Sequence, residues 1–174
     1  GNVLVNSNMW YDTLAENKTY NFKYVFEDLK SIMKRSHINF YSQQSIIGGK
    51  DLGLSAYYNY NSPTDVGDAM TDIGFNMVSL ANYHAFDKKI KGIENSIKYW
   101  TDKNVAYSGT STSEETRNKN NIINKNGVKV GLLSYTMGTD EVYKGTYEIN
   151  IYSDEQAKKD INDLKDKVDI VMVS

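Results

Sequence analysis

The residues best suited to chemistry form a short polar stretch, Asn82-Tyr83-His84, with Asp87 three residues further on. An imidazole beside amide and carboxylate side chains can hold a divalent metal ion or move a proton. His84 is one of only two histidines in the chain. We therefore treat His84 as a candidate acid or as a neighbour of a metal site, with a hydrogen-bonded structural histidine as the alternative.

This polar elbow follows a predicted buried strand. The run from Phe75 to Leu80 is largely apolar on both faces, which is typical of a central strand in a parallel sheet. A helix is predicted before it, with Ser62 as N-cap, Pro63 at the first helical position and Gly74 closing the helix. In open α/β sheets, ligands collect at the carboxyl ends of strands, so the elbow lies where a site is expected.

The remaining elements follow from hydrophobic periodicity and turn signals. Helices are predicted over residues 21–35 and 90–103, and after Ser153 with Ala157, Ile161 and Leu164 turned inward. Short strands are predicted over 3–5, 37–41, 105–107 and 147–151, and a buried strand over 168–173. A hairpin is predicted from Asn120 to Tyr135 around Asn126-Gly127. Residues 6–18, 46–61 and 136–145 are predicted loops, the first with a turn of helix near 11–14. The pattern predicts one α/β domain with a mainly parallel sheet that carries one antiparallel hairpin.

Composition excludes several classes of protein. The chain has 174 residues, a net charge of −2 and no cysteine, so disulfides and thiolate metal sites are excluded. Without a basic stripe, we expect no nucleic-acid partner. No apolar run reaches membrane-spanning length and no signal peptide is evident, so we expect membrane attachment only through an anchor outside this chain.

The long loop from Ile46 to Asn61 is a second candidate region. It contains three glycines and the tyrosine-rich run Tyr57-Tyr58-Asn59-Tyr60. Exposed tyrosines stack well on a sugar or a peptide, so Tyr57, Tyr58 and Tyr60 are candidate binding residues. The alternative is that the loop packs on its own domain.

Several segments together resemble the bacterial capsule-synthesis, poly-γ-glutamate-associated proteins, often called CapA-like. The matching text is GNVLVNS, YSQQSIIGGKDLGLSAY, YNSPTDVGDAMTDIGFNMVSLANYHAFD, GVKVGLLSYTMGTD and KVDIVMVS. The order and spacing of these pieces are family-like across residues 1–174. The resemblance implies a calcineurin-like metallophosphoesterase fold: a layered sheet with flanking helices. It also implies an incomplete copy, because the family continues past the last strand into further histidine motifs.

The resemblance also implies a site for divalent metal ions, from which this chain departs repeatedly. Asn2 stands where the family has Asp, and Asn6 where it often has His. Ser42-Gln43-Gln44 replaces Asn-x-Glu, and Tyr83 replaces the second Asn of an Asn-Asn-His elbow. The site positions are therefore Asn2, Asn6, Ser42, Gln44, Asn82, Tyr83, His84 and Asp87. Amides for carboxylates remove negative charge, and Tyr83 would crowd a metal, so we predict no bound metal or other cofactor.

Three functions remain open at this point. The first is a capsule or poly-γ-glutamate synthesis protein whose degenerate site has a structural or binding role, with capsule polymer or synthesis machinery as partner. The second is an active metal-dependent hydrolase completed by residues beyond Ser174 or by another chain. The third is a surface module that binds an acidic polymer or a sugar through its tyrosine-rich loop. By resemblance we expect an extracellular or cell-surface location.

Overall fold

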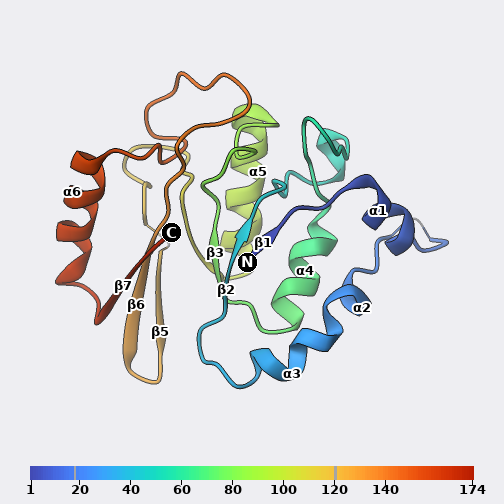
Figure 1. The fold of residues 1–174 in the computed structure, drawn as a ribbon, viewed down its shortest axis with the longest axis horizontal. Coiled ribbons are helices and arrows are strands. Elements are labelled where there is room, and N and C mark those ends of the chain that lie inside the picture. The colour runs from blue at the N-terminus through green and yellow to red at the C-terminus, as the bar shows by residue number, and fades with distance from the viewer. Residues whose placement is uncertain (18, 120) are drawn as a thin grey trace.

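Two β-sheets lie face to face, with helices on their outer faces (Figure 1). The computed structural model describes residues 1–17, 19–119 and 121–174. The layered α/β architecture with flanking helices and one antiparallel hairpin is the predicted class. The hairpin, however, belongs to the second sheet and does not extend the parallel one.

The first sheet contains four parallel strands in chain order: β1 (Asn2–Val3), β2 (Phe40–Gln43), β3 (Met77–Ser79) and β4 (Ala106–Ser108). Two helices, α4 (Thr64–Asp72) and α5 (Lys89–Asp102), supply the residues that cover one face. Each is amphipathic, and its apolar stripe is buried against the strands. All four carboxyl ends of the strands therefore meet at one edge, where the elbow lies.

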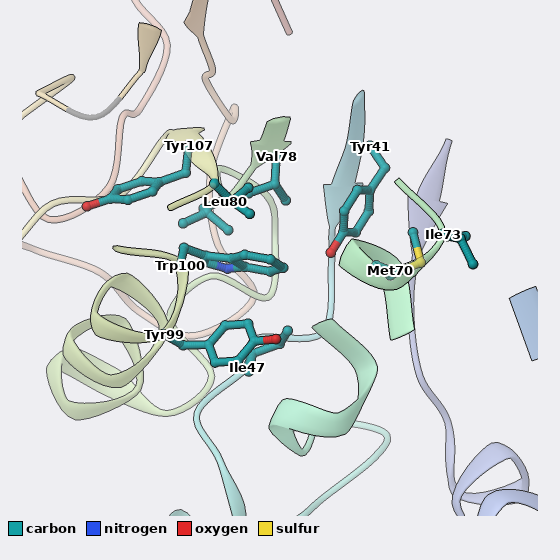
Figure 2. Close-up of a cluster of buried hydrophobic side chains, with 10 residues drawn as sticks. Tyr41, Ile47, Met70, Ile73, Val78, Leu80, Tyr99, Trp100 and Tyr107 are labelled. Atoms are coloured by element: carbon teal, nitrogen blue, oxygen red, sulfur yellow. The ribbon is translucent and has the colours of Figure 1, made fainter. Parts of the chain in front are cut away.

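The core between this sheet and its helices is centred on Trp100 of α5, which is fully buried. Its ring makes edge-to-face contacts with Tyr99, at 4.9 Å between ring centroids, and with Tyr41, at 6.3 Å. Figure 2 shows the indole between Leu80 and Tyr99, with Val78 of β3 above it. Such aromatic pairs add about 1 kcal/mol each beyond the area that they bury.

The second sheet contains β5 (Ile122–Lys125), β6 (Val128–Leu133) and β7 (Ile170–Val173). Strands β5 and β6 are antiparallel around Asn126-Gly127, whose positive φ values of 54° and 85° confirm the predicted tight hairpin. The first predicted residue of the hairpin, Asn120, lies outside the described residues. Val130 and Leu132 of β6 pack on Met77 and Ala106, which joins the two sheets.

Helix α6 (Asp154–Lys165) covers the outer face of the second sheet. Ser153 caps it as predicted, accepting a hydrogen bond from the Gln156 N–H. Leu164 lies against Gly131 of β6, where an added Cβ would come within 2.7 Å of the leucine side chain. A buried Asp160 on the same helix forms two 2.7 Å hydrogen bonds with the Arg117 guanidinium. This ion pair ties α6 to the loop that follows β4.

The prediction of one helix over residues 21–35 was wrong. The segment forms α2 (Lys23–Phe26), a 3₁₀ turn (Glu27–Leu29) and α3 (Lys30–Met33). Phe22 at its start is buried, but Leu29 and Ile32 are 39% and 53% exposed. Because the apolar face is not buried along its whole length, packing does not stabilise a continuous helix.

The predicted loop over 6–18 contains the helix α1 (Ser7–Thr13), so the loop assignment was wrong for that part, and residue 18 lies outside the described residues. Asn6 explains the helix, because its Oδ1 accepts a hydrogen bond from the Met9 N–H. Ser62 is not the N-cap of α4. Its hydroxyl instead donates to Ser45 Oγ, and Pro63 occupies the cap position.

Two predictions near the C-terminal end of the chain also need correction. Strand β7 is not buried: Ile170 and Val173 are 50% and 55% exposed, because β7 pairs with β6 on one side only within the described residues. The predicted strand over 147–151 consists of isolated bridges, Thr110 with Ile149 and Thr136 with Ile151. These single bridges connect residues 149 and 151 to the loops after β4 and β6, and they do not continue into a regular ladder.

Candidate functional site

The elbow after β3 is held in shape by Asn82. Its Nδ2 donates to the carbonyl oxygens of Gln43, at 2.9 Å, and Leu80, at 3.2 Å. Its Oδ1 accepts the His84 N–H at 2.8 Å. Asn82 is only 9% exposed, so all of these bonds lie within the protein. The amide therefore shapes the turn, and both of its polar atoms already have partners.

His84 and Asp87 form a close pair at the end of this elbow. His84 Nδ1 lies 3.0 Å from Asp87 Oδ2, and the Asp87 side chain is completely inaccessible. An ionised carboxylate only accepts hydrogen bonds, so Nδ1 carries the proton in this contact. In the neutral ring, the second ring nitrogen is then the acceptor. The His84 side chain keeps 14% of its surface exposed, so the imidazole is both fixed and accessible.

The environment of Asp87 leaves the carboxylate only partly compensated. Burial raises the pKa of Asp87, and the Tyr60 N–H at 2.6 Å and the neighbouring His84 lower it only in part. Asp140 raises the Asp87 pKa further, and one of its carboxylate oxygens lies 3.6 Å from His84 Nδ1. The second oxygen of Asp87 has no hydrogen-bond partner among the described residues. A carboxyl group with a raised pKa beside a histidine is typical of functional sites.

The tyrosine-rich loop lies directly against this elbow, which the sequence did not reveal. The Asn59 side chain donates to the Asp87 carbonyl, and the Tyr60 ring packs edge-to-face on His84 with 4.6 Å between centroids. Tyr60 is 7% exposed, so it lies beneath the surface. Tyr57 and Tyr58 are instead 74% and 75% exposed, and their rings stack at 4.0 Å. The two candidate regions of the sequence are therefore one region of the molecule.

A row of polar residues crosses the first sheet at the same edge. Strand register aligns Asn2, Ser42, Ser79 and Ser108 across all four strands. They share the face that looks toward the second sheet, because Met77, two residues before Ser79, packs on that sheet. Ser79 and Ser108 are buried, Ser42 is half-buried and Asn2 is exposed. The row therefore runs from the interior of the sandwich to its open side.

Loops from both sheets extend this row into a buried network. Ser108 Oγ donates to Asn118 Oδ1 and accepts the Ser134 N–H. Asn150 Nδ2 donates to Asn118 Oδ1 and to the Ser134 carbonyl. Among the described residues, Ser134 Oγ and Asn150 Oδ1 are buried without a partner. None of these four residues, Ser108, Asn118, Ser134 and Asn150, was among the predicted site positions. The available signal was that Ser108 and Ser134 both end apolar strands.

Gly109 allows the ends of β3 and β4 to come this close. The Leu80 N–H donates to the Ser108 carbonyl at 2.9 Å, and Gly109 has a φ of 115°. A Cβ at this position would lie 2.4 Å from the Ala81 backbone nitrogen, which no side chain permits. The site therefore depends on a glycine that carries no chemistry itself.

The other predicted site positions are more dispersed. Asn6 is exposed and caps α1, and the Gln44 N–H donates to the Val3 carbonyl. Tyr83 is 51% exposed, and its carbonyl accepts the Asp140 N–H at 2.8 Å. Asp140 thereby joins the loop after β6 to the elbow. Asp140 is a site neighbour that the sequence analysis did not single out.

The donors at this edge are a weak match for a two-metal centre. Such a centre needs several carboxylate and imidazole ligands around two cations. Within residues 1–17, 19–119 and 121–174, no three His, Cys, Asp or Glu side chains are grouped to bind a metal ion. Amides and hydroxyls are the main groups present, and Asp87 is already bonded to His84 and Tyr60. These residues by themselves do not fit the dinuclear metal site that the resemblance implies.

Comparison with known proteins shows the family to which the chain belongs. No helix in the described part of the chain is long and apolar enough to cross a membrane. No curated protein matches the sequence. The family model described as bacterial capsule synthesis protein PGA_cap matches residues 1–174. The match spans the whole chain, and the two-sheet α/β architecture is consistent with a metallophosphoesterase-like domain. The chain therefore belongs to the bacterial capsule synthesis protein family PGA_cap.

Proposed function

We propose that this chain serves capsule synthesis as a binding domain whose metallophosphoesterase-like site is degenerate and non-catalytic. The observation that carries the proposal is that the Asp87 carboxylate is buried and already hydrogen-bonded within the protein. It is the only carboxylate among the predicted ligand positions, and its side chain is buried against His84 and Tyr60. The remaining positions provide neutral oxygen, amide or phenol groups, apart from His84.

The small number of anionic ligands supports a non-catalytic site. Two divalent cations a few ångströms apart repel each other, and anionic ligands must compensate that repulsion. Asn2 and Gln44 keep the shapes of Asp and Glu but contribute no negative charge. Without a strongly held metal, water bound at the site keeps a high pKa and is a poor nucleophile. Binding of a polymer or of a protein of the synthesis machinery requires no such centre.

Metal titration tests the proposal. We expect the purified chain to bind neither Mn²⁺ nor Zn²⁺ stoichiometrically by calorimetry, and to hydrolyse bis-p-nitrophenyl phosphate no faster than the His84→Ala variant. A matched variant with Asn2→Asp, Gln44→Glu and Tyr83→Asn restores the family ligand types. That variant should gain metal affinity. Stoichiometric metal in the unaltered chain, with phosphodiesterase activity that His84→Ala abolishes, would refute the proposal.

An active hydrolase is the second candidate, and the His84–Asp87 contact favours it. An imidazole fixed through Nδ1 by a carboxylate, with partial access to solvent, has the geometry of a general acid or base. This candidate requires missing ligands from another chain or from sequence outside residues 1–174. Its substrates would be phosphoesters or γ-glutamyl amides. Supplying those partners and measuring no metal-dependent turnover of either substrate would exclude it.

The proposed partners are the capsule polymer or proteins of the synthesis machinery, and the proposed place of action is the cell surface. Family membership supports both. Cell fractionation with an antibody against the natural protein tests the location. Recovery of the protein with cytosolic markers alone would contradict it.

A further inference from the structure

Two tyrosine rings form the most exposed aromatic feature beside the elbow. Tyr57 and Tyr58 stack with 4.0 Å between ring centroids and 29° between their planes. Each nevertheless keeps about three quarters of its surface accessible, at 74% and 75%. In a stacked pair, each ring covers one face of the other and leaves its opposite face free. The pair therefore presents flat aromatic surface to solvent.

This tyrosine pair is anchored, although its rings are exposed. The residue after it, Asn59, donates to the Asp87 carbonyl, and the next N–H, of Tyr60, donates to Asp87 Oδ2 at 2.6 Å. The Tyr60 ring is buried against His84. Two consecutive residues thus fasten the loop to the elbow. A fixed aromatic surface loses less conformational entropy on binding than a mobile one does.

A third loop joins the same surface. The Asp140 N–H donates to the Tyr83 carbonyl at 2.8 Å, and Glu141 pairs with Lys89 at 2.5 Å. Hydrogen bonding from Asn59 and Lys89 lowers the pKa of Glu141, with Lys89 the larger cause. The tyrosine loop, the elbow and the loop after β6 are therefore in mutual contact, and they form one continuous surface around His84.

The charges on this surface select among ligands. Two exposed acids, Asp140 and Glu141, lie on this surface, while the Asp87 carboxylate is buried beneath it. Lys89 is already paired with Glu141, and the Asp140 side chain is 55% exposed. Such a surface does not attract a polyanion. Exposed carboxylates next to aromatic rings can accept hydrogen bonds from hydroxyl groups, while the rings pack on C–H faces.

From this arrangement we infer that the Tyr57–Tyr58 pair is the stacking platform of a binding site for a neutral glycan. The inference rests on the proposed binding role and specifies its ligand class. A sugar ring packs on a free tyrosine face, and its hydroxyls donate to Asp140 at the rim of the elbow. Poly-γ-glutamate is disfavoured, because each of its residues would bring a carboxylate near Asp140, which pairs with no lysine or arginine among the described residues.

Affinity electrophoresis tests the inference. The purified chain is run through native gels that contain dextran, hydroxyethyl cellulose, soluble xylan or poly-γ-glutamate. We expect retardation by at least one neutral glycan and none by poly-γ-glutamate. The double variant Tyr57→Ala/Tyr58→Ala should weaken glycan binding about tenfold or more, because each ring face contributes on the order of 1 kcal/mol. The double Phe variant, which keeps both rings, should bind nearly as well as the unaltered chain.

The control is Tyr11→Ala on α1, which removes an equally exposed tyrosine, at 76%. It should leave glycan binding unchanged. Retardation by poly-γ-glutamate alone, by none of the four polymers, or equally in the double Ala variant would overturn the inference. The metal titration above is independent of this result. A chain that binds neither glycan nor metal contradicts the glycan site alone, whereas metal-dependent hydrolysis contradicts the non-catalytic role.

Discussion

Two buried aspartates in this molecule have opposite surroundings. Asp87 at the elbow is 2% exposed and Asp160 on α6 is 7% exposed. Burial raises the pKa of both carboxyl groups. At Asp160, hydrogen bonds from the Arg117 guanidinium, the Tyr135 hydroxyl and the Gln156 amide outweigh burial and bring the pKa below its usual value. At Asp87, the Tyr60 N–H and His84 do not outweigh it.

The difference separates a fully compensated buried carboxylate from a partly compensated one. Both oxygens of Asp160 are hydrogen-bonded and its charge is matched by Arg117, so it holds α6 to the rest of the domain. Asp87 keeps one oxygen unpartnered among the described residues, and it lies next to a partly exposed histidine. Carboxyl groups with incompletely compensated burial are found more often at functional sites than elsewhere in a protein.

The largest expected effect comes from Asp160→Asn. It leaves the Arg117 guanidinium, whose side chain is 16% exposed, without a matching charge. Loss of one partner of such a pair should lower the free energy of unfolding by about 3 kcal/mol. Urea denaturation followed by circular dichroism measures the change. The control is Asp163→Asn on the exposed face of α6, which should stay within about 0.5 kcal/mol of the unaltered chain.

Tyr135→Phe should have the next largest effect. It removes the 2.7 Å hydrogen bond to Asp160 but leaves the ion pair with Arg117 in place. A hydrogen bond to a charged group contributes about 1.5 kcal/mol to the free energy of unfolding. The loss should shrink greatly in the Asp160→Asn background, because the acceptor is then no longer charged. Equal losses in both backgrounds would show that the hydroxyl does not act through Asp160.

Asp87→Asn should change stability less than the same substitution at Asp160. The amide oxygen can still accept the Tyr60 N–H, and removal of the charge relieves the cost of burying it. We expect a change of less than about 1 kcal/mol in the free energy of unfolding at pH 7. A loss as large as that of Asp160→Asn would mean that Asp87 is equally a structural residue, and the comparison would fail.

The pH dependence of stability should give the smallest effects, with opposite signs at the two sites. The lowered pKa of Asp160 stabilises the fold above pH 3.8, and this contribution is lost as the pH falls through the folded-state pKa. The raised pKa of Asp87 favours the protonated native state, so its contribution falls as the pH rises from 3.8 through the folded-state value.

Free energies of unfolding measured from pH 3 to pH 7 distinguish the contribution of Asp160 from that of Asp87. The Asp160→Asn variant should lose less stability than the unaltered chain as the pH falls below 3.8. Asp87→Asn should instead remove the decline just above pH 3.8, so that its stability relative to the unaltered chain improves as the pH rises. Identical pH profiles for the two variants would contradict the opposite pKa directions.

Local features of the fold were predictable from the sequence, and packing between distant segments was not. The hairpin at Asn126-Gly127 and the cap at Ser153 each depend on a few adjacent residues, and both were predicted correctly. The segment 21–35 has a helical pattern, but whether its apolar face is covered depends on the whole fold. The division into two sheets was also hidden, because Val130 and Leu132 would be apolar in either arrangement.

The same limit applies to the site. The elbow could be located because it follows a recognisable strand, and the His84–Asp87 contact spans only three residues. The role of Asn82 depends on the Gln43 carbonyl, 39 residues away in the sequence. The contact of the tyrosine loop with the elbow, through Tyr60, also joins segments that no local pattern connects. The inward position of Asp160 was missed because an Asp on a helix is ordinarily solvated.

The strand order β1-β2-β3-β4 has a consequence for how the protein is made. Each new strand joins the edge formed by the one before it, so the first sheet can assemble during synthesis from the amino terminus onward. Its inner face, however, carries Met77 and Ala106, whose cover comes from Val130 and Leu132. Until β6 leaves the ribosome, that face is bare. We expect a nascent chain whose exposed part ends near Ser108 to bind chaperones, and one in which Leu133 has also left the ribosome to be released from them.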